Sequence, residues 1–398
     1  MAKPARTTFQ ATDASDAVSH FSLLAGGPLY RLARRWGLAA PPAGFVRLGI
    51  VIALFAWLPL LVLAPFGRDD AAISFLHSLG THARLLVAIA LFFVAEAWFD
   101  KRSRDAVRTL VDSRLVRAEQ ISAFRSALLE AIKWRDAWMV EAAVVVITLL
   151  FILVGPRSDL PREVSTWRTT AEGNPTPAGW WYGMVSFPVF QFLLWRWGAR
   201  MLIWWRLLWR VNRLDLQLPP AHPDLAAGLG SFGDAHLTLA PLTVGVSTML
   251  AASFAEDILY AGADVSRFAL PLAGAICATV FLTVAPLLTF SPRLIRVKQE
   301  GLLAYGTLAA GYVHAFDDKW IRQKAWQREP LLGSADVQSL ADVANSFDVV
   351  RSMRIVPLSL FQVLLVVGAA TLPALPLALF VIPADELILK ALGAIFKV

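Results

Sequence analysis

The fold class of this chain follows from an apolar stretch at residues 45–66, FVRLGIVIALFAWLPLLVLAPF. It carries no charged side chain after Arg47. At about 1.5 Å of rise per residue, a helix of this length crosses a hydrocarbon core of about 30 Å. Several comparable stretches follow it along the chain. The sequence therefore predicts an all-α, polytopic bundle of transmembrane helices.

The composition also indicates a chain surrounded by lipid. Of its 398 residues, 57% are hydrophobic and only 17% are charged, whereas soluble domains are about 25% charged. Four tryptophans lie at the ends of apolar stretches, where indole rings prefer the level of the lipid headgroups: Trp98, Trp138, Trp180 and Trp181. The lone cysteine, Cys277, excludes an intrachain disulfide and a cysteine-based metal cluster. We expect no cofactor.

We expect seven membrane spans, at approximately 45–66, 83–99, 137–155, 181–204, 237–260, 269–290 and 355–382. The second is the shortest, and the last contains Pro373 and Pro376, which bend a helix. The apolar stretch 301–316 has only 16 residues, a length more typical of a buried or surface helix. Whether it spans the membrane stays open at this point, and the position of the C-terminus depends on it.

The basic residues predict the orientation of the chain. With the N-terminus inside the cell and seven spans, 29 Lys and Arg residues fall on the inner side and 8 on the outer side. Such an excess marks the cytoplasmic side of a membrane protein. We therefore expect a multi-pass protein of a bacterial inner membrane, with its N-terminus inside and its C-terminus outside. The same asymmetry accounts for the net charge of +7, so we expect no nucleic-acid partner.

The segments between the spans divide the chain into four parts. Residues 1–44 form a cytosolic or interfacial segment, in which 20–38 suits a helix lying in the inner interface. Residues 45–290 hold six spans, a cytosolic amphipathic helix over 103–133 and a loop over 210–236. Residues 291–354 form a cytosolic helical segment, including a helix over 334–352 capped by Ser334. Residues 355–398 hold the last span and a second interfacial helix over 384–398.

Four local patterns together resemble a group of uncharacterised bacterial multi-pass membrane proteins. They are Gly26-Gly27-Pro28-Leu29 before Arg34-Arg35, Trp57-Leu58-Pro59-Leu60-Leu61, the loop from Leu214-Asp215-Leu216 through His222-Pro223-Asp224 to Gly228-Leu229-Gly230, and Leu331-Leu332-Gly333-Ser334-Ala335-Asp336 continuing to Asp342. The resemblance implies a bacterial origin and a polytopic fold, and it implies no activity. The layout also resembles that of insect chemoreceptor channels, whose helices extend into a cytosolic anchor.

Four charged residues fall at membrane depth, in the inner half of the bilayer: Glu96, Glu141, Arg196 and Arg200. Arg196 and Arg200 are four residues apart and therefore share one face of a helix. Charges at this depth need a partner or an aqueous cavity. One interpretation is an ion or proton path, or an anion site at the arginines. The other is structural pairing between helices, which we regard as the more common case.

Glu256 and Asp257 lie at the predicted outer end of the fifth span. Paired carboxylates at a pore mouth concentrate cations, especially when several subunits form a ring. The alternative is an ordinary polar helix end in headgroup water.

Two cytosolic segments contain further candidates. His222 and Asp224 lie in a loop rich in proline and glycine, where Asp224 suits a helix cap and the loop suits gating or partner docking. His314, Asp317 and Asp318 lie close together on one helix. The spacing of these three allows a shared metal ion, with His222 and Asp224 as added ligands, or simply a solvated polar face.

Three functions follow from these observations. The first is an oligomeric channel or transport protein with an ion or small-solute path. The second is a non-catalytic membrane scaffold or sensor whose cytosolic helices bind a protein partner. The third is a membrane-bound enzyme acting on lipid or quinone. The sequence contains no phosphate-binding loop, HExxH, GxSxG or CxxC pattern, which disfavours the third.

Overall fold

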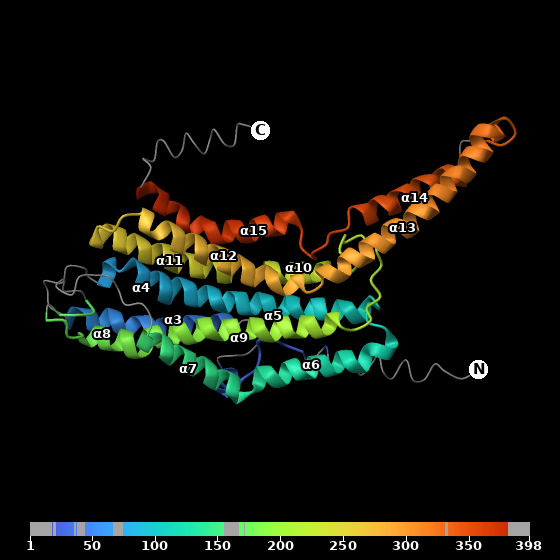
Figure 1. Ribbon diagram of the computed structural model, residues 1–398. Helices are drawn as coiled ribbons and strands as arrows, with labels where there is room; N and C mark the ends of the chain where they lie inside the picture. The colour runs from blue at the N-terminus through green and yellow to red at the C-terminus, as the bar shows by residue number, and fades with distance from the viewer. Residues whose placement is uncertain are drawn as a thin grey trace.

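The computed structural model describes residues 18, 21–35, 37, 44–66, 75–154, 167–170, 172–330 and 333–380. These residues are predominantly helical and include no β-strand. The helices form an elongated bundle, and a helical hairpin projects from one end of it (Figure 1). We call this end of the bundle the hairpin end and the opposite end the loop end.

Two long helices run through the bundle. The first extends over Leu79–Asp112 and comprises α4 (Leu79–His82), a π-helical segment (Ala83–Ala88) and α5 (Ile89–Asp112). The second is α9 (Phe187–Asn212), which continues from α8 (Pro177–Trp181). Seven further helices pack on these two or on one another: α3 (Gly44–Leu63), α6 (Ile121–Asp136), α7 (Trp138–Val154), α10 (Gly230–Leu237), α11 (Ala240–Ala261), α12 (Ser266–Leu288) and α15 (Leu360–Thr371).

The core between α5 and α9 is rich in buried aromatic side chains. Phe92 stacks on Phe190 with 5.8 Å between the ring centroids, and both side chains are at most 2% exposed. Further along the same two helices, the ring of Phe99 meets that of Trp204 edge-on at 5.5 Å. Aromatic pairs in these geometries add to the free energy gained by burial.

Five helices are long and apolar enough to cross a membrane: Gly44–Phe66, Leu79–Asp112, Gly230–Ala261, Ser266–Leu288 and Leu360–Leu377. A sixth candidate is the pair Ala118–Asp136 and Trp138–Val154, which is bent by 46°. The prediction of an all-α fold with several membrane helices is confirmed for the described residues. The number of seven stays a prediction, because the fourth predicted span lies in α8 and α9, which are not among these candidates.

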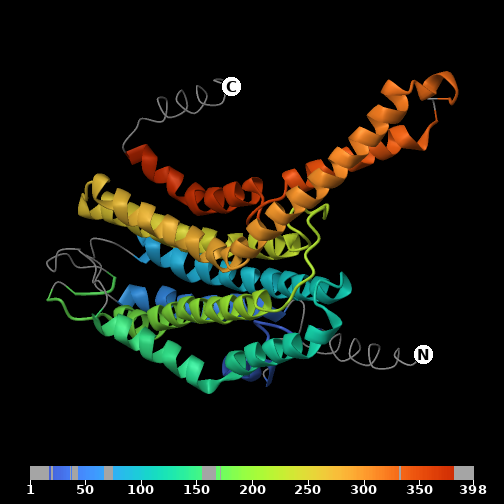
Figure 2. The same cartoon turned by 45° about the vertical axis from the view of Figure 1, so that its right-hand side comes forward.

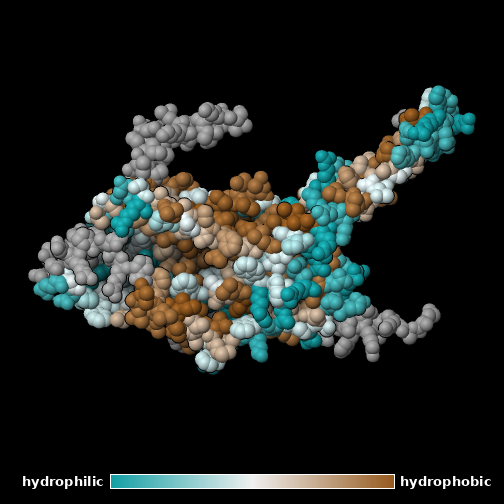
Figure 3. Space-filling view, viewed as in Figure 1, coloured by the Kyte–Doolittle hydropathy of each residue, from teal (hydrophilic) through white to brown (hydrophobic). Residues whose placement is uncertain are grey.

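The surface of the bundle supports this assignment. On the face shown in Figure 3, apolar residues form a belt around the middle, and polar residues gather at the two ends. On α7 most large apolar side chains point away from the bundle: Val145, Val146, Ile147, Leu149, Leu150 and Leu153 are all exposed. An apolar surface of this kind is suited to contact with lipid.

The projecting hairpin consists of α13 (Ser291–Phe316) and α14 (Ala335–Arg351), which pack along each other. It leaves the bundle at an angle, and its outer half has no other helix beside it (Figure 2). The side chain of Ser334 accepts a hydrogen bond from the N–H of Asp336 at 3.2 Å, as the sequence predicts for the start of α14. The apolar stretch 301–316 lies in this hairpin and not in the apolar belt.

The predicted single helix over 103–133 is wrong. The first helix ends at Asp112, and α6 begins at Ile121. Between them Arg114 takes a left-handed conformation with φ 53°, and Leu115 is buried. Apolar residues continue at helical spacing on both sides of this turn, but the tertiary contacts of the turn interrupt the helix.

Predictions at the two ends of the chain need revision as well. Residues 21–27 are not helical, so only α2 (Pro28–Arg35) remains of the interfacial helix predicted over 20–38. The last span begins at Leu360, and at Leu372 it changes from α-helix to 3₁₀-helix beside the predicted proline bend. The helix predicted over 384–398 lies outside the described residues.

Candidate functional site

The four charged residues predicted at membrane depth come together between α5, α7 and α9. Glu96 of α5 forms an ion pair with Arg196 of α9, and both side chains are at most 5% exposed. Arg200, one turn further along α9, has its guanidinium close to Gly27, and the Glu141 carboxylate lies against the same residue. A Cβ added to Gly27 would lie 2.4 Å from Glu141 Oε1 and 2.9 Å from Arg200 Nη2.

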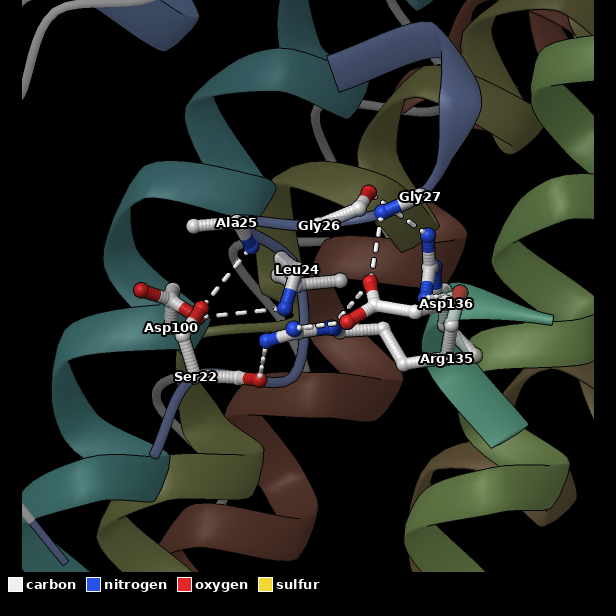
Figure 4. A network of polar contacts seen from close by, with 9 residues as sticks. Ser22, Leu24, Ala25, Gly26, Gly27, Asp100, Arg135 and Asp136 are labelled. Carbon is white, nitrogen blue, oxygen red and sulfur yellow. Dashed lines mark hydrogen bonds and ion pairs between the residues drawn. The ribbon is translucent and has the colours of Figure 1, made fainter. Parts of the chain in front are cut away.

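The N-terminal segment 21–27 completes this cluster through polar contacts with Asp100, Arg135 and Asp136 (Figure 4). The sequence analysis did not predict these contacts. The hydroxyl of Ser22 and the N–H of Leu24 both donate hydrogen bonds to Oδ1 of Asp100, the latter at 3.2 Å. Arg135 donates from Nη1 to the carbonyl oxygen of Ser22 at 2.6 Å. Asp100 was not predicted as a member of this cluster. It follows Glu96 by one helical turn, so its i, i+4 spacing from Glu96 was the feature of the sequence that could have indicated it.

On the other side of this segment, the backbone of its two glycines forms hydrogen bonds with charged side chains. Arg200 donates from Nη2 to the carbonyl oxygen of Gly26 at 3.1 Å and from Nη1 to that of Arg135 at 3.0 Å. The N–H of Gly27 donates to Oδ1 of Asp136 at 2.8 Å. Gly27 has φ +88°, a conformation that glycine adopts without steric cost.

Burial explains why charged side chains surround this segment. Phe21, Leu23 and Leu24 are at most 1% exposed, so the backbone is held inside the bundle. Buried N–H and C=O groups need hydrogen-bond partners, and local contacts such as that from the N–H of Gly26 to the carbonyl oxygen of Leu24 at 2.8 Å satisfy only some of them. Side chains of α5, α6 and α9 satisfy others.

The charges of the cluster balance. It contains four carboxylates, Glu96, Asp100, Asp136 and Glu141, and four guanidinium groups, Arg104, Arg135, Arg196 and Arg200. Arg104 is half-exposed and binds Asp100 at 2.9 Å. Charges removed from water are tolerated when they are paired and hydrogen-bonded. The arrangement therefore joins four helices, α5, α6, α7 and α9, to the N-terminal segment. Towards the loop end, the stacked rings of Phe92 and Phe190 lie next to it in the core.

Glu256 lies at the loop end and serves as a helix cap. Its carboxylate accepts hydrogen bonds from the N–H of Gly80 at 2.9 Å and from the hydroxyl of Ser78 at 3.1 Å. These contacts place it at the N-terminus of α4, where a negative charge is favourable. Glu256 is buried, so it does not present a carboxylate to solvent beside Asp257 as a pore-mouth pair requires.

Asp224 organises the loop before α10, although the N-cap position of that helix is Leu229. Its carboxylate accepts hydrogen bonds from the N–H groups of Ala226 and Gly230 at 2.8 Å and of Gly228 at 3.1 Å. Burial alone raises the pKa of Asp224, but these hydrogen bonds and one from His222 outweigh it and hold the pKa below its usual value.

A cavity of about 460 Å³ opens beside this loop, where the hairpin joins the bundle. Its lining includes Thr109, His222 and Arg354. The side chain of Arg354 donates to the carbonyl oxygen of Asp224, and its N–H donates to that of Leu225 at 2.7 Å. The polar groups of the loop thus hold the chain segment between α14 and α15.

The remaining candidates lie on the hairpin. Asp317 and Asp318 both pair with Arg322, at 3.1 Å and 3.4 Å, and His314 is exposed. Across the described ranges, no three His, Cys, Asp or Glu side chains gather closely enough to hold a metal ion. The interpretation as a polar surface fits this placement better than a shared metal site.

Comparison with models of protein families, with curated proteins and with solved structures found no match for this chain. The resemblance to bacterial multi-pass proteins and the functional alternatives therefore gain no support from relatives, and the function must be argued from the geometry.

Proposed function

We propose that this chain is a multi-pass membrane scaffold that assembles with copies of itself through the α13/α14 hairpin. The observation that carries the proposal is the outer face of α13. Exposed residues follow this face in two rows: Leu303, Thr307, Ala310 and His314 in the first, and Ala304, Leu308, Gly311 and Ala315 in the second. Neither row contains Asp, Glu, Lys or Arg.

The spacing of these rows is typical of a helix that packs on another helix. In both rows the residues recur after four, three and four positions, as in the heptads of coiled coils. Leu303 and Leu308 are 74% and 59% exposed. A Cβ added to Gly311 would have no atom within 4 Å, so a partner helix has room to approach closely there.

Another copy of the same chain suits this face better than lipid does. The hairpin extends away from the apolar belt, between a polar base and a polar tip (Figure 3). An uncharged face meets its own copy without placing like charges opposite each other, as a symmetric interface requires. The exposed surface of α14 combines Val337, Ala341 and Ala344 with the carboxylates of Asp342 and Asp348. Two copies of it would bring like charges together, which makes α13 the better surface for self-association.

The substitution Gly311→Arg tests the proposal. Within one chain the new side chain points into open space, so we expect the melting temperature in detergent to stay unchanged. In an assembly it places a bulky charge between helices, so the particle mass measured by light scattering should fall from that of an oligomer to that of a monomer. Asn345→Arg, on the exposed surface of α14, is the matched control and should remain oligomeric. A monomeric wild type, or an oligomeric Gly311→Arg variant, would contradict the proposal.

The proposal includes the topology of seven spans, with the hairpin end in the cytosol of a bacterium. The distribution of basic residues supports it, because 29 of 37 fall on the predicted inner side. A tag at the C-terminus should then be accessible from the periplasm of intact cells. A tag that is reached only after the inner membrane is opened would rule out an odd number of spans.

An ion or small-solute path is the second candidate, because ionisable residues at membrane depth are costly and often line such paths. The ion pair of Glu96 and Arg196 disfavours such a path in this conformation. The stacked rings of Phe92 and Phe190 disfavour it as well. Proteoliposomes distinguish the two. A flux that rises in Phe190→Ala and falls in a folded Arg196→Gln variant would support a path, and the absence of flux in wild type and Phe190→Ala supports the scaffold.

A further inference from the structure

Helix α2 carries an exposed basic face, on which Arg31 is near enough to Asp136 to attract its carboxylate without forming an ion pair. Arg31, Arg34 and Arg35 are spaced by three and one positions and therefore lie on one side of the helix. All three are exposed, whereas Ala33 is 4% exposed. Within the described part of the chain, none of the three guanidinium groups forms an ion pair. Like charges this close repel one another, so an anion bound among them relieves an unfavourable interaction.

The position of α2 brings this face to the edge of the apolar belt. The ring of Tyr30 packs on that of Phe45 in the first turn of α3, with 5.8 Å between centroids. Gly27, just before α2, binds Asp136 two residues before α7 begins. The lipid-facing surface of α7 starts there, since Trp138 and Met139 are 70% and 59% exposed. The arginines therefore lie at the headgroup level of the leaflet at the hairpin end.

An open cavity of about 670 Å³ lies on this side of α2, lined by Pro28, Arg31, Leu32, Arg34 and Arg35. Guanidinium groups bind phosphate oxygens in pairs. Leu32 is 43% exposed, so an apolar contact stands beside the charges. We propose that this cavity binds the phosphate of an anionic phospholipid from the adjacent leaflet.

The proposed lipid has a consequence for the charge cluster. Residues 21–27 lead directly into α2 and are held by Asp100, Arg135, Asp136 and Arg200. A phospholipid on α2 restrains the same stretch of backbone from its other end. Bound lipid should therefore stabilise the whole bundle and not α2 alone.

The test compares the full-length protein in nanodiscs of phosphatidylcholine with and without phosphatidylglycerol. The triple variant R31Q/R34Q/R35Q removes the proposed site. The variant R322Q/K324Q/R328Q removes the same charge from exposed positions at the tip of the hairpin and is the matched control. The single variant Arg34→Gln keeps two arginines and guards against a folding defect of the triple variant.

Phosphatidylglycerol should raise the melting temperature of wild type and control at least twofold more than that of the triple variant. Native mass spectrometry should show that wild type and control retain bound phosphatidylglycerol and that the triple variant loses it. The Arg34→Gln variant should retain an intermediate amount. Equal effects in the triple variant and the control would overturn the proposal. An equal rise with inorganic phosphate in phosphatidylcholine alone would overturn it in favour of a free-phosphate site.

Discussion

At the scale of single residues, Glu96 and Arg196 show how this bundle tolerates charge. The pair lies within the helices predicted to cross the membrane and is almost fully buried. Removing two charges from water costs free energy that their attraction only partly returns. The pair is therefore a source of specificity in helix packing, and it stabilises the fold only as long as both partners are present.

A double-mutant cycle tests this view. We expect Glu96→Leu and Arg196→Met to destabilise the protein by about 3 kcal/mol each, because each leaves one buried charge without its counter-ion. The double variant should recover more than half of the combined loss. Thermal unfolding in detergent, followed by size-exclusion chromatography, measures all four proteins. Additive losses in the double variant would mean that the two residues act separately.

Asp224 predicts a dependence of stability on pH. Its pKa is below the usual value in the folded state, so its contribution is present above the unfolded pKa of about 3.9 and is lost as the pH falls through the lower folded value. We expect Asp224→Asn to cost about 2 kcal/mol at neutral pH, since its three charge-assisted hydrogen bonds from backbone N–H groups are weakened or lost. The difference in melting temperature between wild type and variant should shrink below about pH 4. A difference that stays constant down to pH 3 would contradict the assignment.

The sequence predicts some of these residues and misses others for physical reasons. Glu96, Glu141, Arg196 and Arg200 could be placed at one depth because helical rise converts sequence position into distance. Glu256 could not be recognised as a cap, because the N-terminus that it caps begins at Leu79, far away in the sequence. Contacts of this kind depend on the tertiary arrangement, which single-sequence spacing does not contain.

At the scale of elements, the segment 21–27 is the least expected part of the fold. Its apolar residues resemble one face of a short amphipathic helix, yet they are buried as irregular backbone. The irregular conformation depends on Asp100, Arg135 and Asp136, because these side chains form hydrogen bonds with backbone groups that would otherwise pair within a helix. The break between α5 and α6 has the same origin in tertiary contacts.

Gly27 is the position at which this segment should be most sensitive. We expect Gly27→Ala to cost about 2 kcal/mol, because alanine is strained at a positive φ and its Cβ would contact Glu141 and Arg200. Gly37→Ala is the control, since Gly37 also has a positive φ, +72°, but no atom within 4 Å of an added Cβ. The larger loss of melting temperature should belong to Gly27→Ala. Equal losses would show that backbone strain alone, without the charge cluster, determines the effect.

At the scale of the whole molecule, the chain combines a lipid-facing bundle with a hairpin that extends beyond it. The fold class and most of the membrane helices follow from the apolar stretches alone. The hairpin could be predicted as a helical segment over 291–354 that includes a helix over 334–352. Its projection from the bundle involves tertiary contacts, such as the hydrogen bond from Arg354 to Asp224, that the sequence does not reveal. That projection leaves the uncharged face of α13 without a neighbour in the chain.

Cysteine cross-linking in native membranes tests the proposed assembly most directly. In a Cys277→Ser background, a single cysteine replaces Leu308 on the uncharged face of α13, or Asn345 on the exposed surface of α14. Treatment with a mild oxidant should link the Leu308→Cys chains into dimers, because packed helices bring equivalent positions within the reach of a disulfide, and should leave the Asn345→Cys chains monomeric. Monomers for both variants, or equal cross-linking of both, would contradict self-assembly through α13.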